Sequence, residues 1–240
     1  MAPFRSLARL SNIAKVSQYV DKVADLGRKN LLFRVDFKHL YSIWQLCKSH
    51  EEYKLGLIAV NHFYNFGRQL SPEGVNKLFV FSMRCGELEE SLKLLEGARD
   101  WLPKPPDIDL VYGLMASFVT KRDYLSVKRV FKAIRSNWQM RLTAKAYRLC
   151  IEAMLCSDEN PLEEALMVYC DSAVMGIALP SEVHALLLNC LHRKIALEPA
   201  KAAFYETSAL SVRNRLGEEC MNEGGYKISR ATSPKITLRA

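Results

Sequence analysis

The densest charge in the sequence lies between residues 121 and 148. This stretch carries nine cations and one acid, Asp123, so its net charge of +8 equals that of the whole chain. The cations are Lys121, Arg122, Lys128, Arg129, Lys132, Arg135, Arg141, Lys145 and Arg148. Such clusters pair with phosphate oxygens and hold a nucleic acid without reading its bases. The stretch is therefore a candidate RNA-phosphate site, and the alternative is a solvated basic helix face in a protein that binds no RNA.

The spacing within this stretch is helical. Lys128, Lys132 and Arg135 recur at i, i+4 and i+7, and apolar residues fill the opposite face. Trp138 and Tyr147 flank the cations and can stack on bases, although the pattern favours a core position for Tyr147. We expect contact with RNA, most concretely rRNA, that does not depend on base sequence.

Three pairs of acids are the strongest candidates for general acid or base chemistry. They are Glu51-Glu52, Glu89-Glu90 and Glu163-Glu164. Each pair falls in the first turn of an expected helix, where negative charge offsets the helix dipole by about 0.3 to 1 kcal/mol. The sequence also has no Gly-rich phosphate loop and none of the common hydrolase or kinase motifs. We therefore expect no enzyme activity, no cofactor and no small-molecule substrate.

The seven cysteines do not form a metal-binding pattern. There is no CxxC pair, and no histidine stands near them at zinc-ligand spacing, so no metal site is expected. Four of them, Cys85, Cys150, Cys170 and Cys190, fall within expected helices or at their ends. Free cysteines in such places behave as small buried hydrophobes, which fits a reducing compartment.

One helical pattern recurs five times and indicates the elements that carry these residues. It consists of an apolar residue, a small residue three positions later, and two larger residues three and four positions beyond that. The instances are Tyr53, Gly56, Ala59, Val60; Leu88, Ser91, Leu94, Leu95; Tyr124, Val127, Val130, Phe131; Leu162, Ala165, Val168, Tyr169; and Leu197, Ala200, Ala203, Phe204. The small positions are 35, 36, 38 and 35 residues apart, so the chain repeats about every 35 residues.

Each patterned helix follows another apolar helical segment. These segments are expected at 37–47, 75–84, 110–120, 146–156 and 183–192. Turns are expected at Ser71-Pro72, at 103–106 and at 179–181, where proline cannot continue a helix, and at 85–87 and 157–161 within the units. The sequence thus predicts an all-α, right-handed α-solenoid of about five two-helix repeats over residues 36–216.

The stretch from Arg84 to Leu95 resembles the middle of a pentatricopeptide repeat, and residues 123–134 and 162–169 echo it. Gly176 to Pro180 resembles the end of such a repeat. The resemblance implies a binding solenoid.

In family members that read RNA, the fifth and last residues of each repeat select one base. Here those positions hold Lys77 and Ile108, then Gly113 and Ala144, which does not make a base code; a frame shifted by one brings in Asn76 and Asp107.

The two ends do not repeat. Residues 1–35 are expected to supply an N-terminal capping helix. The first 20 residues contain Arg5, Arg9 and Lys15 and no acid, which resembles a mitochondrial transit peptide; an ordinary amphipathic first helix is the alternative. Residues 217–240 are expected to form an extended basic tail, with contacts to an anionic or large partner through Lys227, Arg230, Lys235 and Arg239.

Two functions of different classes follow. The first is a non-catalytic scaffold of an organellar ribonucleoprotein in the mitochondrial matrix, most concretely a structural subunit of the mitochondrial ribosome that contacts rRNA phosphates and neighbouring proteins. The second is an accessory subunit of a mitochondrial ATP synthase or respiratory complex that binds proteins only. No apolar run approaches the roughly 20 residues needed to span a bilayer, so neither hypothesis includes a membrane span.

Overall fold

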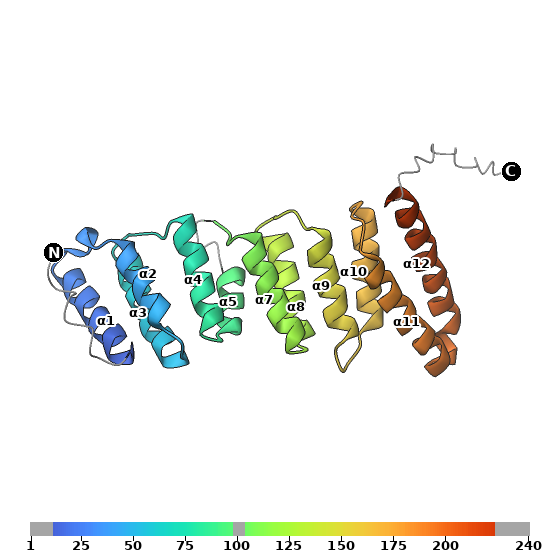
Figure 1. Cartoon of the computed structure of the whole chain (residues 1–240), viewed down its shortest axis with the longest axis horizontal. Coiled ribbons are helices and arrows are strands. Elements are labelled where there is room, and N and C mark those ends of the chain that lie inside the picture. The colour runs from blue at the N-terminus through green and yellow to red at the C-terminus, as the bar shows by residue number, and fades with distance from the viewer. Residues whose placement is uncertain (1–11, 98–103, 224–240) are drawn as a thin grey trace.

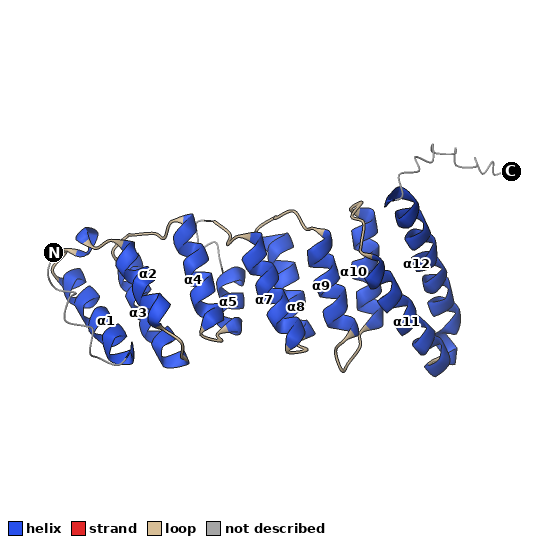
Figure 2. Cartoon of the chain, viewed as in Figure 1, coloured by secondary structure: helices blue, strands red, loops and turns tan. Residues whose placement is uncertain are grey.

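The structure is a computed structural model that describes residues 12–97 and 104–223. Within these residues it is all-helical, with no strand (Figure 2). The helices are α1 (Asn12–Arg28), α2 (Phe37–Leu46), α3 (His50–Asn65), α4 (Pro72–Arg84), α5 (Leu88–Glu96), α7 (Ile108–Thr120), α8 (Tyr124–Lys132), α9 (Ala144–Leu155), α10 (Leu162–Val174), α11 (Ser181–Leu197) and α12 (Ala202–Glu223). The expected all-α class is therefore correct.

The helices follow one another along a single row, with α1 at one end and α12 at the other (Figure 1). Each helix packs on a neighbour in the chain, and several also pack on the helix one place further along, as α2 does on α4 and α7 on α9. At the start of the row α1 packs mainly on α3 and buries Val16, Tyr19 and Val23. This helix therefore covers one side of the α2–α3 hairpin.

Local sequence signals explain where these helices begin and end. Ser49 caps α3, and its own backbone N–H donates to the Glu52 carboxylate at 3.1 Å, which completes a capping box. Ser71 caps α4, and Pro72 takes the first helical position, where a missing N–H costs nothing. Gly86 turns the chain from α4 into α5 with a φ of +80°. The predicted turns at 71–72 and 85–87 are thus confirmed.

The small positions of the first four pattern instances lie in helix contacts. Ser91, Val127 and Ala165 are fully buried. At Gly56 an added Cβ would lie 2.7 Å from Phe81 Cζ and 3.2 Å from Trp44 Cδ1. The backbone of α3 therefore approaches α2 and α4 too closely for any side chain at this position.

The fifth pattern instance is wrong. Leu197 is the last residue of α11, Ala200 lies in a 3₁₀ turn (Pro199–Lys201), and Phe204 is 51% exposed at the start of α12. Pro199 cannot continue α11, so the four residues do not share a helix face. The stripe that α12 buries is instead Tyr205, Ala209 and Val212.

The boundary of the predicted tail is also corrected. Residues 217–223 belong to α12, and Gly217 sits inside a helical turn between Arg215 and Glu219, which bond to each other. The predicted tail contacts Lys227, Arg230, Lys235 and Arg239 lie outside the described residues, as do Arg5 and Arg9. No helix in the described part of the chain is long and apolar enough to cross a membrane.

The thiols divide into protected and accessible groups. Cys47, Cys150 and Cys190 are buried, whereas Cys156 and Cys170 are exposed, so the expected burial of Cys170 is wrong. Burial raises the pKa of the Cys47 and Cys150 thiols to about 12. Because the thiolate is the reactive form, these two cysteines are doubly protected.

We therefore expect a maleimide reagent to label Cys156 and Cys170 in the folded protein before it labels Cys47, Cys150 or Cys190. Mass spectrometry of peptides after a short reaction measures the order. Denaturant should equalise the rates. Early modification of Cys150 in the native protein would contradict the packing of α9 described here.

Candidate functional site

Two of the three predicted RNA-phosphate residues on α8, Lys128 and Arg129, bond acids from neighbouring repeats. Arg129 donates to both oxygens of Glu96 on α5, at 2.9 and 2.7 Å, and to Glu89 at 2.8 Å. These bonds raise the pKa of Arg129, with Glu96 the larger cause. Each of the three guanidinium nitrogens of Arg129 therefore donates a hydrogen bond to an acid of α5.

A second set of cations, on α8 and on the π-helical turn that follows it (Ala133–Asn137), bonds to α10. Lys128 Nζ lies 2.5 Å from Glu164, and Arg135 makes a two-pronged contact with Asp171 at 2.7 and 3.0 Å. The Tyr147 hydroxyl donates to the same Asp171 at 2.8 Å. Of the three residues predicted to share one face, Lys128 and Arg135 therefore bond α10, whereas Lys132 has no acidic partner among the described residues.

The remaining six cations of the stretch do not form one patch. Arg122 pairs with Asp158, Arg148 pairs with Glu152 within α9, and Lys145 Nζ lies 5.0 Å from the centre of the Tyr112 ring. The other three are exposed and have no acidic partner among the described residues; they are Lys121, Lys132 and Arg141. The turn that holds Lys121 and the loop that holds Arg141 lie at opposite ends of α8, so these cations are separated.

Most ion pairs of the basic stretch join residues that are about one repeat apart along the chain. The partners of Arg122, Lys128, Arg129 and Arg135 lie 33 to 40 residues away along the chain. His50 with Glu87 and Lys201 with Glu163 continue the series, each at 2.5 Å. Single exposed pairs contribute roughly 0 to 1 kcal/mol, so the series aligns neighbouring helices more than it stabilises any one of them.

The two aromatic residues flanking the basic stretch belong to the core. The buried apolar residues form two clusters, one in the N-terminal and one in the C-terminal part of the row, and partly buried Trp138 packs against both. Its indole N–H donates to the Leu95 carbonyl at 3.0 Å. Tyr147 is fully buried and meets the Phe131 ring edge-on at 5.2 Å. Tyr147 is thus the core residue that the pattern favours, and Trp138 is not placed for base stacking.

The paired acids are in the first turns of α3, α5 and α10, as predicted. They stand on separate helices, and Glu89, Glu163 and Glu164 each bond a cation of a neighbouring repeat. The Lys201 ammonium, hydrogen-bonded to Glu163, lowers the pKa of that carboxyl. The described residues contain no group of acids, cysteines and histidines arranged to hold a metal ion.

Asn76 and Asp107, the residues that the shifted frame places at the two base-selecting positions of one repeat, bond each other across neighbouring helices. Asn76 Nδ2 donates to the Asp107 carboxylate at 2.5 Å, and the Asp107 backbone N–H returns a bond to Asn76 Oδ1 at 2.9 Å. Tyr112 and Thr143 share a bond of 2.6 Å at the equivalent place. Lys77, the fifth position in the first of the two frames, pairs with Glu73 on its own helix instead.

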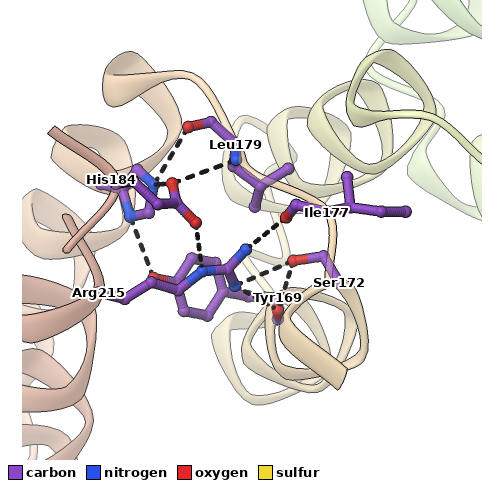
Figure 3. Close-up of polar contacts among 7 residues, drawn as sticks. Tyr169, Ser172, Ile177, Leu179, His184 and Arg215 are labelled. Carbon is purple, nitrogen blue, oxygen red and sulfur yellow. Dashed lines mark hydrogen bonds and ion pairs between the residues drawn. The ribbon is translucent and has the colours of Figure 1, made fainter. Parts of the chain in front are cut away.

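A buried polar cluster fastens the last helix, and its seven residues are drawn in Figure 3. Fully buried His184 places Nδ1 3.0 Å from the Tyr169 hydroxyl and Nε2 2.8 Å from Glu219. A neutral imidazole satisfies both contacts by donating from Nε2 to the carboxylate and accepting from the tyrosine.

Arg215 completes this cluster from α12. Its guanidinium donates to Glu219 at 2.7 Å, to the Ile177 carbonyl at 2.7 Å, and to the Tyr169 carbonyl and Ser172 hydroxyl at 3.0 Å each (Figure 3). All three guanidinium nitrogens are therefore used inside the protein. The cluster holds α12 against α10 and the turn that precedes α11.

Beside the cluster, α10 and α12 enclose an apolar groove of about 370 Å³. Glu163, Leu166, Met167, Tyr169 and Cys170 line it from α10; Phe204, Thr207, Ser208, Ser211 and Val212 line it from α12. Met167 is 66% exposed at its edge. Reasoning from the sequence missed this groove because the fifth pattern instance assigned Phe204 to the core.

Comparisons with known proteins add no family to this picture. No protein-family model matches the sequence, and no curated protein matches it either.

Proposed function

We propose that the chain is a non-catalytic scaffold that binds protein partners within a larger assembly. In this proposal the row of helices is a right-handed α-solenoid of about five degenerate, pentatricopeptide-like hairpins, the last of them divergent. The observation that carries it is the series of ion pairs between repeats. Four of the nine cations that would have to meet RNA phosphates already bond acids of neighbouring repeats.

The distribution of exposed apolar residues supports the same class. Met167 and Val174 on α10, Met175 directly after it, and Phe204 and Leu210 on α12 are each more than half exposed, as are Phe33, Leu125 and Leu197 elsewhere. Large exposed apolar groups that gather on neighbouring helices are typical of protein-binding surfaces. A protein-only accessory subunit of a mitochondrial ATP synthase or respiratory complex is the concrete form of this proposal.

A structural subunit of the mitochondrial ribosome is the second candidate. It is favoured by Lys121, Lys132 and Arg141, the exposed cations of the stretch that have no acidic partner among the described residues. In that case these side chains and the basic residues beyond 223 would contact rRNA phosphates.

Nuclease treatment separates the two candidates. The native assembly is isolated from its own cells, and half of it is treated with ribonuclease before gradient sedimentation. We expect the protein to remain with the same protein partners in both halves. Its release into the light fractions by ribonuclease alone would overturn the protein-only proposal.

The three cations without a described partner give a second test. We expect the combined change Lys121→Glu, Lys132→Glu and Arg141→Glu to leave the amount of protein in the assembly within about twofold, measured by quantitative mass spectrometry. The matched control changes three exposed cations outside the stretch, Lys38→Glu, Lys54→Glu and Arg193→Glu. A steep, salt-dependent loss for the first set but not for the control would favour phosphate contacts.

A further inference from the structure

A pocket of about 320 Å³ lies between α2 and α4, which pack on each other near the start of the row (Figure 1). Its floor is aromatic. Trp44 and Phe81 are only 2% and 1% exposed, and their ring centres lie 5.2 Å apart with 6° between the ring planes. The exposed residues Gln45 and Val80 also line the pocket. Concave sites that are mostly apolar and carry a few polar groups are typical of ligand binding.

The charges at one end of the pocket are already partnered within the protein. Lys77 Nζ lies 2.6 Å from the Glu73 carboxylate and 4.4 Å from the centre of the Tyr41 ring. Asn76, which lines the pocket beside Lys77, bonds Asp107 at 2.5 Å. The cation at this end is therefore used inside the protein.

The other end of the pocket holds Arg84, which follows Lys77 along α4 by seven residues, or about 10 Å. The Arg84 guanidinium donates through Nη2 to the Trp44 carbonyl, and this bond positions it beside the aromatic floor. The carbonyl is neutral, and the bond leaves the other N–H donors of the guanidinium for further contacts. No acid within the described part of the chain pairs with Arg84, so its charge can bind a ligand.

The packing of one repeat on the next does not require a cation at this place. α7 begins 36 residues after α4, so Ala116 and Thr120 occupy the positions of Val80 and Arg84. Neither residue is charged. The positive charge beside the α2–α4 pocket therefore needs an explanation other than the fold, and a bound acidic group supplies one.

The aromatic floor favours a peptide over RNA. A base would have to stack on an aromatic face, but Trp44 and Phe81 are buried against each other and Lys77 covers Tyr41. The pocket instead accepts the end of an apolar side chain. Arg84 suits a single carboxylate through charge-assisted hydrogen bonds, whereas a phosphate backbone pairs with several cations at once.

We propose that the pocket between α2 and α4 binds a short acidic segment of a partner protein, with an apolar side chain on Trp44 and Phe81 and a neighbouring carboxylate on Arg84. This inference rests on the proposed protein scaffold and names the surface and the chemistry of one partner contact. Residues 224–240 of the same chain carry four cations and no acid, so they do not complement this site.

Site-specific photo-crosslinking in the full-length chain identifies the partner segment. The photoreactive amino acid p-benzoylphenylalanine replaces Gln45 in one variant and Val80 in another, and both are expressed in the native cells. Ile58 on α3 is the control position, because its 43% exposure matches the 42% exposure of Val80. We expect positions 45 and 80 to trap the same segment of one partner protein, with an aspartate or glutamate next to an apolar residue, and position 58 not to trap it.

A synthetic peptide with the sequence of the trapped segment then measures the affinity by fluorescence anisotropy. Arg84→Glu should weaken binding at least tenfold, and the loss should shrink at high salt. The matched control is Arg193→Glu. Arg193 occupies the position of Arg84 in α11, where Ile151 and Cys190 take the places of the two floor aromatics. The control should bind the peptide like the unchanged protein.

Two further measurements separate recognition from folding. Val80→Glu removes no hydrogen bond, so this variant should melt like the unchanged protein and still bind at least tenfold more weakly, because it repels the acidic peptide. An unchanged affinity of Val80→Glu would overturn the inference even if Arg84→Glu failed to fold. Exchanging the acid of the peptide for its amide should weaken binding to the unchanged protein but strengthen binding to Arg84→Glu, because a repulsion is removed.

Several other outcomes would overturn the inference. They are trapping of RNA or of this chain itself, a trapped segment without an acid, no trapping at 45 and 80, equal affinities of Arg84→Glu and Arg193→Glu, and no rescue by the amide peptide. If one of these occurs while the unchanged protein stays with its protein partners after ribonuclease treatment, the scaffold function stands without this pocket. If the unchanged protein leaves the assembly on that treatment, both fail.

Discussion

Ala165→Arg is expected to lower the free energy of unfolding by about 3 kcal/mol or more, whereas Ala200→Arg should change it by less than about 0.5 kcal/mol. Ala165 is fully buried on α10, which packs on α9, so arginine would be overpacked there and its charge would lack a partner. Ala200 is exposed in the turn before α12. The same substitution thus meets opposite environments at two positions that the sequence pattern treats as equivalent.

Urea unfolding followed by circular dichroism measures both variants on one scale. The pair controls for the size and charge of the new side chain, since only the position differs. Equal loss in the two variants would mean that the α11–α12 connection is packed as the repeat pattern predicts. An unchanged midpoint for Ala165→Arg would show that α10 is placed wrongly.

Arg215→Ala is expected to release α12 from the rest of the row. The guanidinium holds two carbonyls, a hydroxyl and the Glu219 carboxylate, and both members of the ion pair are mostly buried, at 13% and 15% exposure. Removing one partner of a buried pair costs roughly 3 to 5 kcal/mol, because the other charge and the carbonyls lose their contacts.

Hydrogen exchange detects this change helix by helix. Amides of α12 and of the turn before α11 should exchange at least tenfold faster, while those of α2 to α5 should keep their protection. Arg213→Ala is the control, since Arg213 is exposed on the same helix and bonds only exposed His192 among the described residues. Equal exchange of α12 in the two variants would contradict the role given to the cluster.

Hydrophobic spacing was sufficient to locate most of the helices. The predicted segment 37–47 corresponds to α2, and 110–120 corresponds to α7, because each has an apolar stripe at helical spacing. Gly56 and Ser91 were found as small contact residues for the same reason. The positions of helices and of their small contact residues depend on the spacing of apolar residues within one segment, so they can be predicted without knowing which distant residues pack against them.

Features that depend on partners far along the chain were not predictable in this way. The charge of the basic stretch was counted over neighbouring residues, but the acids that bond it, such as Glu96 and Asp171, lie in other repeats. The cluster around His184 joins α12 to residues 35 and more positions earlier, and no local spacing indicates it. Pro199 is the one local signal that would have corrected the fifth pattern instance.

Experimental density for the protein in its native assembly tests the central claim most directly. We expect Lys128, Arg129 and Arg135 to bond Glu164, Glu96 and Asp171 in the assembly as they do in the isolated chain, with protein density rather than RNA in contact with α10 and α12. Phosphate groups within hydrogen-bond distance of those three cations, with the inter-repeat ion pairs broken, would contradict the account and establish the basic stretch as an RNA-binding site.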